Sequence, residues 1–217
     1  MSAIYPIPST LDPIIDVTAD APIGIFDSGI GGLSVTLEIA RHLPNERFVY
    51  YADTANVPYG PREDQDIREL TAQAIEWLYR KGCKAAVVAC NTASAFSLDY
   101  LRTHYGERFP IIGLVPALKP AVLATHSKTV AVLATPATFR GQLIKEVMTR
   151  FAEPAGVNVI PVTCLDLVPF VEAGEQMSPA CLATLTKILQ PVVDQGADYL
   201  VLGCTHYPFL KSSIQYI

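Results

Sequence analysis

The feature that most constrains the fold is a regular alternation of short apolar runs with segments whose apolar residues recur at helical spacing. Glycine, proline or small polar residues join each run to the segment that follows it. Strands that alternate with helices need crossover connections, which make the strands parallel and place helices against the sheet. The apolar runs span residues 23–26, 48–53, 85–89, 129–134, 157–162 and 197–203.

These runs fall into two groups of three, so we predict an α/β fold with two pseudo-symmetric lobes. Each lobe would be a parallel-rich sheet flanked by helices, with the active site in the crevice between the lobes. Two prolines near residues 115–119 favour a boundary there. The predicted divisions are an N-terminal extension, a first lobe, a second lobe and a C-terminal segment, at residues 1–22, 23–115, 116–208 and 209–217.

One helix of the second lobe has a clear start and a conflicting end. Ser178 and Pro179 form a favourable N-cap and first-turn pair for a helix that carries Leu185 and Leu189. Pro191 should kink or end the same helix, because proline lacks an N–H and its ring clashes with the preceding turn.

Composition excludes several classes of protein. The 217 residues are 50% hydrophobic and 17% charged, which supplies a sizeable core and argues against disorder. The net charge is −5 without a Lys/Arg cluster, so nucleic acid is not expected as a partner. No apolar run reaches the ~20 residues of a membrane-spanning helix, and the N-terminus lacks the pattern of a secretory signal. We therefore expect a cytoplasmic protein without membrane contact.

Five cysteines without a CxxC pair are expected to be free thiols. Cys90 in VVACNTAS and Cys204 in LVLGCTHYP lie 114 positions apart, and each ends an apolar run just before polar turn residues. Ligands of open α/β sheets bind at such strand ends, and the start of a following helix lowers a thiol pKa. We therefore predict two accessible, acidified thiols. A lone cysteine more often only fills space, as we expect for Cys83, Cys164 and Cys181.

Other polar residues also follow apolar runs. Asp27 and Ser28 lie in DSGIGG, and Asp53 is the last residue of the next run. From spacing alone Asp27 is equally a helix N-cap or a turn residue. The glycines lack G-x-G-x-x-G spacing and no GxxxxGK[ST] occurs, so neither a dinucleotide nor ATP is indicated. His206 follows Cys204 closely enough to support its thiolate, but the four histidines lack zinc-ligand spacing and no metal site is predicted.

The motifs FDSGIGGLSV, DTANVPYG, VVACNTAS and LVLGCTHYP, in this order, resemble those of bacterial glutamate racemases of the aspartate/glutamate racemase family. The resemblance covers about residues 23–210, and GLVPALKPA with VAVLATPAT is similar to the subgroup that carries an N-terminal extension. It implies cofactor-independent, two-base conversion of L-glutamate to D-glutamate, which serves peptidoglycan synthesis and cell shape. It also implies a homodimer and, for extended members, a peptidoglycan precursor as effector.

The resemblance also assigns roles by motif. It makes Cys90 and Cys204 the two acid/base residues, the first taking the proton from D-glutamate and the second from L-glutamate. Asp27 supports the first thiol, and Glu172 and His206 support the second. The implied substrate contacts are Asp27, Ser28, Asp53, Tyr59, Gly60, Asn91, Thr92, Thr205 and His206.

This chemistry makes physical sense of the pattern. Racemisation needs a base on one face of the α-carbon and an acid on the other. The motifs contain no Lys or Arg, so N–H and hydroxyl donors would stabilise the carbanion. The family continues with a segment that returns to the first lobe, so residues 209–217 are interpreted as its start, and the chain as either a short form or a truncated one.

Three alternative hypotheses remain open from the sequence. A related two-cysteine racemase could act on aspartate or another amino acid. A Cys-His thiol hydrolase would pair His206 or His104 with a single nucleophile. In a non-catalytic binding lobe, both cysteines would belong to the core.

Overall fold

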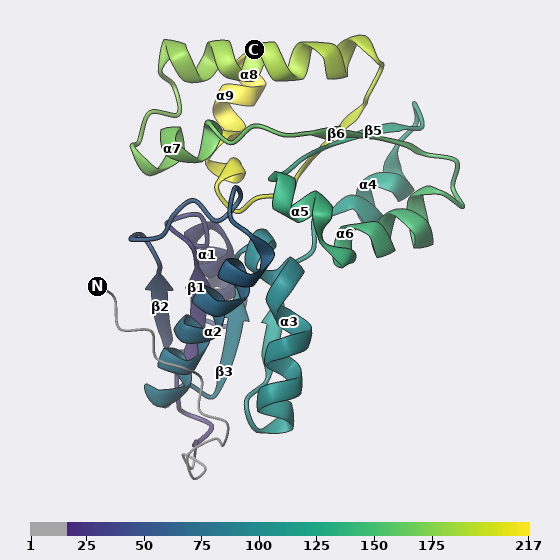
Figure 1. Ribbon diagram of the computed structural model, residues 1–217. Helices are drawn as coiled ribbons and strands as arrows, with labels where there is room; N and C mark the ends of the chain where they lie inside the picture. The colour runs from purple at the N-terminus through teal and green to yellow at the C-terminus, as the bar shows by residue number, and fades with distance from the viewer. Residues whose placement is uncertain (1–16) are drawn as a thin grey trace.

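The computed structural model describes residues 17–217 and contains two all-parallel sheets, one in each half of the chain (Figure 1). The α/β expectation is therefore confirmed. Most of the predicted N-terminal extension lies outside the described residues. Among the described residues, no helix has both the length and the apolar character needed to cross a bilayer.

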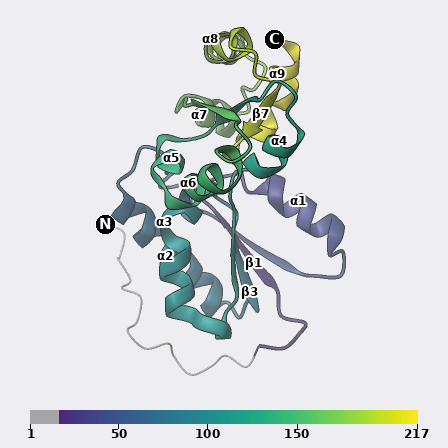
Figure 2. The same cartoon turned by 90° about the vertical axis from the view of Figure 1, so that its right-hand side faces the viewer.

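The first sheet has the strand order β2-β1-β3-β4, and its strands end facing the second half of the molecule (Figure 1). Figure 2 shows α1 on one face and α2 and α3 on the other. The α2/α3 face is the larger core, because α1 has no fully buried residue. The elements are β1 (Ile23–Asp27), α1 (Leu33–His42), β2 (Phe48–Ala52), α2 (Asp64–Arg80), β3 (Ala85–Val88), α3 (Asn91–Tyr105), a 3₁₀ turn (Gly106–Arg108) and β4 (Ile111–Gly113).

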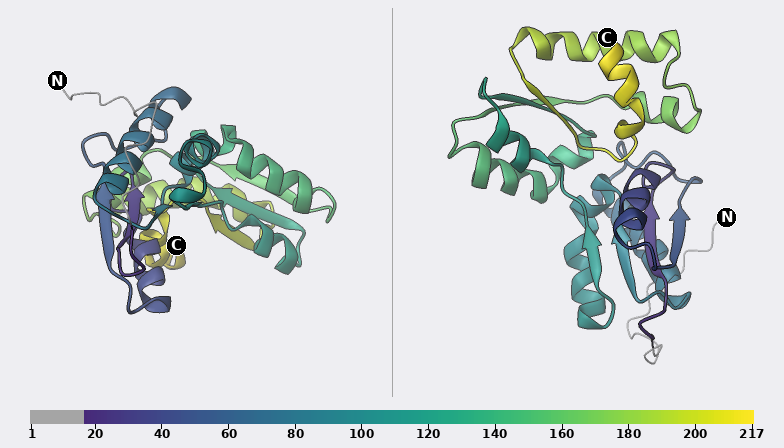
Figure 3. Two further views of the ribbon diagram at one scale, coloured as in Figure 1. Left: turned by 90° about the horizontal axis from the view of Figure 1, so that it is seen from below. Right: turned by 180° about the vertical axis from the view of Figure 1, so that it is seen from behind.

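The second sheet has the order β6-β5-β7. Helices α7 and α8 pack on one face, and α4 and α6 pack on the other (Figures 1 and 3). The elements are α4 (Leu118–Ala124), β5 (Thr129–Leu133), α5 (Pro136–Arg140), α6 (Gln142–Val147), a π-helical turn (Met148–Ala152), β6 (Asn158–Val162), α7 (Leu167–Glu172), α8 (Pro179–Asp194), β7 (Tyr199–Leu202), a 3₁₀ turn (Tyr207–Leu210) and α9 (Lys211–Tyr216).

The two sheets place their cysteine-bearing strands in equivalent registers. Phe26 of β1 pairs with Val88 of β3, and Leu133 of β5 pairs with Leu202 of β7. Each pair is followed by the same hydrogen bond, from residue 89 to the carbonyl of residue 26 at 2.7 Å and from residue 203 to that of residue 133 at 2.8 Å. Each thiol lies one residue further on. This equivalence is what an internal duplication would produce, and it agrees with the predicted pseudo-symmetry of the lobes.

Local structure departs from the sequence expectations in three places. Ser178 caps α8 through the N–H of Cys181, as predicted, but the helix does not end at Pro191 and continues to Asp194. Proline removes a single helical hydrogen bond there, in the last turn, where least of the helix depends on it. The short strand β4 and the helix α5 have no expected counterpart, because runs of three to five residues carry too little periodicity to be recognised.

Shortening a leucine side chain should change the free energy of unfolding differently on the two faces of the first sheet. Leu78 in α2 is fully buried against Gly24, whereas Leu37 in α1 is 57% exposed. Leu78→Ala should lower the free energy of unfolding by about 2 to 5 kcal/mol, because it leaves a cavity. The matched Leu37→Ala change should be nearly neutral. Chemical denaturation measures both, and equal losses would contradict a core on the α2 face.

Candidate active site

Cys90 is held by the junction between β3 and α3. It is the N-cap residue of α3 with extended backbone, and its Sγ accepts the N–H of Ala93 at 3.5 Å. The Ser28 hydroxyl, which follows β1 in the sheet, lies 3.7 Å from Sγ. The thiol is buried, with 5% of the residue exposed. The predicted position at a strand end and helix start is therefore confirmed.

Cys204 occupies the equivalent place after β7, but the segment after it differs from the one after Cys90. A bend and the 3₁₀ turn come next, so no α-helix begins at this cysteine. Its Sγ lies 3.8 Å from Nδ1 of His206 and is also buried, with 8% of the residue exposed. An imidazole thus lies beside Cys204, whereas the first turn of α3 lies beside Cys90.

His206 links Cys204 to a carboxylate. Its Nε2 lies 2.5 Å from Oε1 of Glu172, the last residue of α7. The same Oε1 accepts the backbone N–H of Ile30 at 2.9 Å, from the glycine turn of the first lobe. Glu172 therefore joins the lobes while it orients the imidazole.

Asp27 lies at the end of β1 and is fully buried. Its Oδ2 accepts the N–H of Gly29 at 3.0 Å, and its Oδ1 accepts the hydroxyl of Thr205 from the second lobe at 3.1 Å. Gly32, not Asp27, is the N-cap of α1, so Asp27 is not a helix cap; it ends β1, and its side chain accepts a hydrogen bond from the turn that follows. This carboxylate makes a second contact between the lobes.

A third contact between the lobes is made by hydroxyl groups. Thr92 in the first turn of α3 lies 2.8 Å from Thr135, oxygen to oxygen, and Thr135 lies 3.0 Å from Thr138. All three side chains are buried. Thr135 follows β5, so the rule of strand ends that selected Asp27 could also have selected it from the sequence.

Asp53 contacts a residue of the cavity wall without lining the cavity itself. Its Oδ2 accepts the hydroxyl of Tyr59 at 2.6 Å, and Asn56 donates to both carboxylate oxygens. Tyr59 in turn reaches the cavity between the thiols, which Asp53 does not line.

Both thiols line one small cavity between the lobes. Most residues predicted to contact substrate line it as well, but Asp27, Asp53 and the predicted supporting residue Glu172 do not. Sequence reasoning missed Pro58, Val168 and Thr135. The lining residues are Ser28, Pro58, Tyr59, Gly60, Cys90, Asn91, Thr92, Thr135, Val168, Cys204, Thr205 and His206.

The expectation of accessible, acidified thiols is wrong. Burial, and then the negative charge of Asp27, raise the pKa of Cys90 to about 12. Burial also raises the pKa of Cys204, and the nearby charges of Cys90 and Asp27 act in the same direction. Backbone N–H groups lower both pKa values, but desolvation of the thiolate outweighs them. Burial raises the pKa of Asp27 too.

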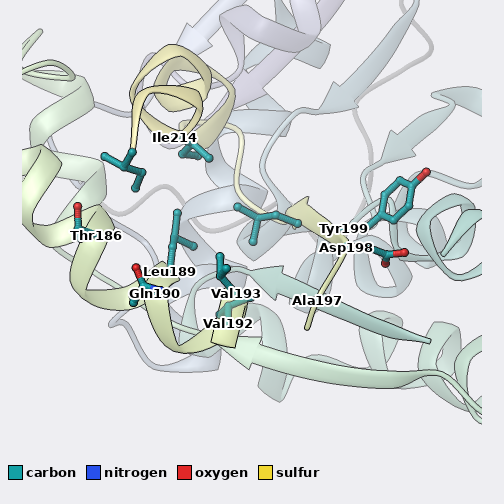
Figure 4. Close-up of a pocket in the computed structure, with 11 residues that line it drawn as sticks. Thr186, Leu189, Gln190, Val192, Val193, Ala197, Asp198, Tyr199 and Ile214 are labelled. Atoms are coloured by element: carbon teal, nitrogen blue, oxygen red, sulfur yellow. The ribbon is translucent and has the colours of Figure 1, made fainter. Parts of the chain in front are cut away.

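A second cavity lies in the second lobe, between α8, β7 and α9 (Figure 4). Aliphatic side chains such as Leu189, Val192 and Ile214 form most of its wall, with Asp198 and Tyr199 at one side. No cysteine lines it. The chemistry of paired thiols is therefore confined to the cavity between the lobes.

The arrangement of the site defines a class of protein. The model of the Asp/Glu/hydantoin racemase family matches residues 23–216, and the chain belongs to that family. The chain is similar to glutamate racemases of several bacteria.

The similarity extends over most of the chain. Glutamate racemase of Deinococcus radiodurans is 60% identical over 196 residues, which cover 89% of this chain and 66% of that protein. Escherichia coli glutamate racemase, solved with L-glutamate and the activator UDP-MurNAc-Ala, has a TM-score of 0.80 at 36% identity, covering 91% of this chain and 74% of the other. The Francisella tularensis enzyme, solved with D-glutamate, has a TM-score of 0.78 at 33% identity, with 91% and 73% covered. The chain thus spans about two thirds to three quarters of these relatives.

The raised pKa of Cys90 leads to a prediction about alkylation. The rate of alkylation by iodoacetamide should rise with pH and reach its midpoint well above the ordinary thiol pKa of ~8.5. Asp27→Asn should move the midpoint to lower pH, because a neighbouring negative charge is removed. Mass spectrometry of the Cys90 peptide measures the midpoint, while the plateau rate reports access.

Asp99→Asn is the matched control, since it removes one exposed charge from α3. It should leave the midpoint unchanged. An Asp27→Asn profile that coincides with the wild-type profile would show that Asp27 does not control the thiol.

Proposed function

We propose that this chain interconverts L-glutamate and D-glutamate by a cofactor-independent, two-base mechanism in which Cys90 and Cys204 act on opposite faces of the α-carbon. One observation carries the proposal: two thiols, each just beyond the end of equivalent strands of two sheets, line the same cavity. The similarity to glutamate racemases supports the choice of substrate.

The reaction is a balanced exchange of protons. One cysteine, as thiolate, removes the α-proton, and the electron pair of the broken C–H bond spreads onto the substrate carboxylate. The other cysteine, as thiol, donates a proton to the opposite face. The site is left with its two protonation states exchanged, so the reverse reaction begins from the product complex. No oxidant or reductant is consumed.

The surroundings of the thiols suit this chemistry. A thiol whose pKa is raised is a stronger base once ionised, which favours abstraction of a weakly acidic α-proton. The ammonium group of an amino acid brings a positive charge that stabilises a neighbouring thiolate. Asp27 and Ser28 beside Cys90, and Glu172 and His206 beside Cys204, are therefore assigned as supporting groups.

The substrate carboxylate groups would be bound by neutral donors. The cavity wall contains no Lys or Arg, but it carries Ser28, Asn91, Thr92 and Thr205. Oriented hydroxyl and N–H donors stabilise the charge that develops on the carboxylate during proton removal, because they need not reorganise. The hydrogen bond from Tyr59 to Asp53 fixes the ring at the cavity wall.

The proposal also includes the subgroup of the chain, its biological role, its oligomeric state and its effector. We assign the chain to the N-terminally extended subgroup, to peptidoglycan synthesis in the cytoplasm and to a homodimer. The activator bound to the E. coli relative supports a peptidoglycan precursor as effector. The five free cysteines suit a reducing compartment.

Removing either thiol should stop racemisation. Cys90→Ala and Cys204→Ala should each lower kcat by more than about a hundredfold, because each removes one of the two acid/base groups. Circular dichroism follows the inversion of each enantiomer, and deuterium incorporation from D₂O at the α-carbon reports the proton transfer that remains in each variant.

Two other buried cysteines provide matched controls. Cys83→Ala and Cys181→Ala remove core thiols outside the cavity and should retain activity. Unfolding of the Cys90 and Cys204 variants, with activity falling only in step with the folded fraction, would favour a core role. A trapped acyl-enzyme and a dispensable second cysteine would favour a thiol hydrolase.

Substrate choice separates the proposal from its nearest rival. L-Glutamate and L-aspartate are incubated separately with the protein, and the decay of optical rotation is measured for each. We expect glutamate to be inverted, because the cavity residues lie in motifs shared with glutamate racemases. Inversion of aspartate alone would overturn the assignment.

A further inference from the structure

We propose that Tyr50 is a positioning residue of this site, whose hydroxyl fixes the peptide unit that holds Glu172 against His206. The inference rests on the proposed racemase function and deepens it by adding a group outside the four motif cores. Tyr50 lies on β2, beneath the glycine turn formed by residues 28–32, which connects β1 to α1.

The hydroxyl of Tyr50 donates to the carbonyl oxygen of Gly29 at 2.8 Å. The N–H of Ile30 donates to Oε1 of Glu172 at 2.9 Å. This carbonyl and this N–H belong to one peptide unit, which is planar and trans, so they point to opposite sides. Tyr50 and Glu172 therefore hold the same unit from its two sides, and a rotation that breaks one bond breaks the other.

The peptide unit needs this external support because its first residue is glycine. A Cβ at Gly29 would lie 2.0 Å from Oε1 of Glu172, so a side chain there would displace the Glu172 carboxylate. Glycine has more backbone freedom than any other residue, so the residue that the close approach of Glu172 favours at this position restrains the backbone least. The Tyr50 hydroxyl supplies the restraint that a side chain at this position would otherwise give.

The Tyr50 hydroxyl also packs closely against Gly32 of the same turn. A Cβ at Gly32 would lie 2.8 Å from the Tyr50 oxygen, which shows how closely the ring end packs on the backbone. Burial and the charges of Asp27, Cys90 and Glu172 raise the pKa of Tyr50. The phenol therefore stays protonated and keeps its hydrogen-bond donor for the Gly29 carbonyl.

A series of contacts connects Tyr50 to Cys204. Glu172 accepts from Ile30 and lies 2.5 Å from Nε2 of His206, whose Nδ1 lies 3.8 Å from the thiol. Tyr50 thus acts from the first lobe on the thiol of the second lobe. Its loss should slow proton transfer at Cys204 more than at Cys90.

The test compares Tyr50→Phe with Tyr51→Phe. Tyr51 is the next residue of β2 and faces the opposite side of the sheet, where its ring packs against Trp77 with centroids 5.2 Å apart. Tyr50→Phe should lower kcat roughly 3- to 10-fold, the range expected for one lost hydrogen bond. Tyr51→Phe should stay within about twofold of the wild type. Thermal unfolding of both variants checks that the fold is retained.

Isotope effects distinguish positioning from general loosening. With glutamate deuterated at the α-carbon, slower transfer at Cys204 makes that step more rate-limiting. The isotope effect on kcat/KM should then rise for the enantiomer whose proton Cys204 removes and fall for the other. Two isotope effects that stay at their wild-type values would overturn the inference.

A double-mutant cycle tests the route through Glu172. If Tyr50 acts through this carboxylate, Tyr50→Phe should cost clearly less in a Glu172→Gln background than in the wild type. Fully additive losses would overturn the inference. Wild-type protein without racemase activity would overturn the proposed function and this inference with it, whereas active wild type with an unaffected Tyr50→Phe variant would overturn this inference alone.

Discussion

The site depends on one close contact, between the glycine turn of the first lobe and the His206–Glu172 pair of the second. A Cβ at Gly31 would lie 2.5 Å from Nδ1 of His206, and one at Gly29 would meet Glu172 even more closely. The backbone N of His206 would also lie 2.8 Å from a Cβ at Gly31, so glycine is required there for steric reasons, whereas a side chain at Gly29 would displace the Glu172 carboxylate. The contact brings the carboxyl ends of two separate sheets together, which places both thiols on one cavity.

Burial between the lobes has two opposite effects on the thiols. It removes water and so disfavours the thiolate, which explains why the pKa values of Cys90 and Cys204 are raised. The same desolvation strengthens every electrostatic interaction inside the cavity. A ligand that brings its own positive charge, such as the ammonium group of an amino acid, would stabilise a thiolate in such a site.

The backbone positions of the two cysteines are equivalent, but the groups beside the two thiols differ. Equivalent strand registers place the two cysteines, as an internal duplication would. Cys90 then has a helix start and the Ser28 hydroxyl beside it, whereas Cys204 has an imidazole backed by a carboxylate. A racemase requires proton transfer at both faces, but it does not require the same auxiliary groups at each.

The sequence alone determined the α/β class, the parallel strands and the position of both cysteines at strand ends, because these depend on local periodicity and on the residues that follow each run. It also placed Asp27 and His206 near the site, through their distance along the chain from a strand end. Only the tertiary structure decided that the thiols are buried rather than accessible, since burial depends on how the lobes close. Likewise, the pairing of Glu172 with Ile30 and of Tyr50 with Gly29 joins residues distant in sequence, and no local pattern specifies such contacts.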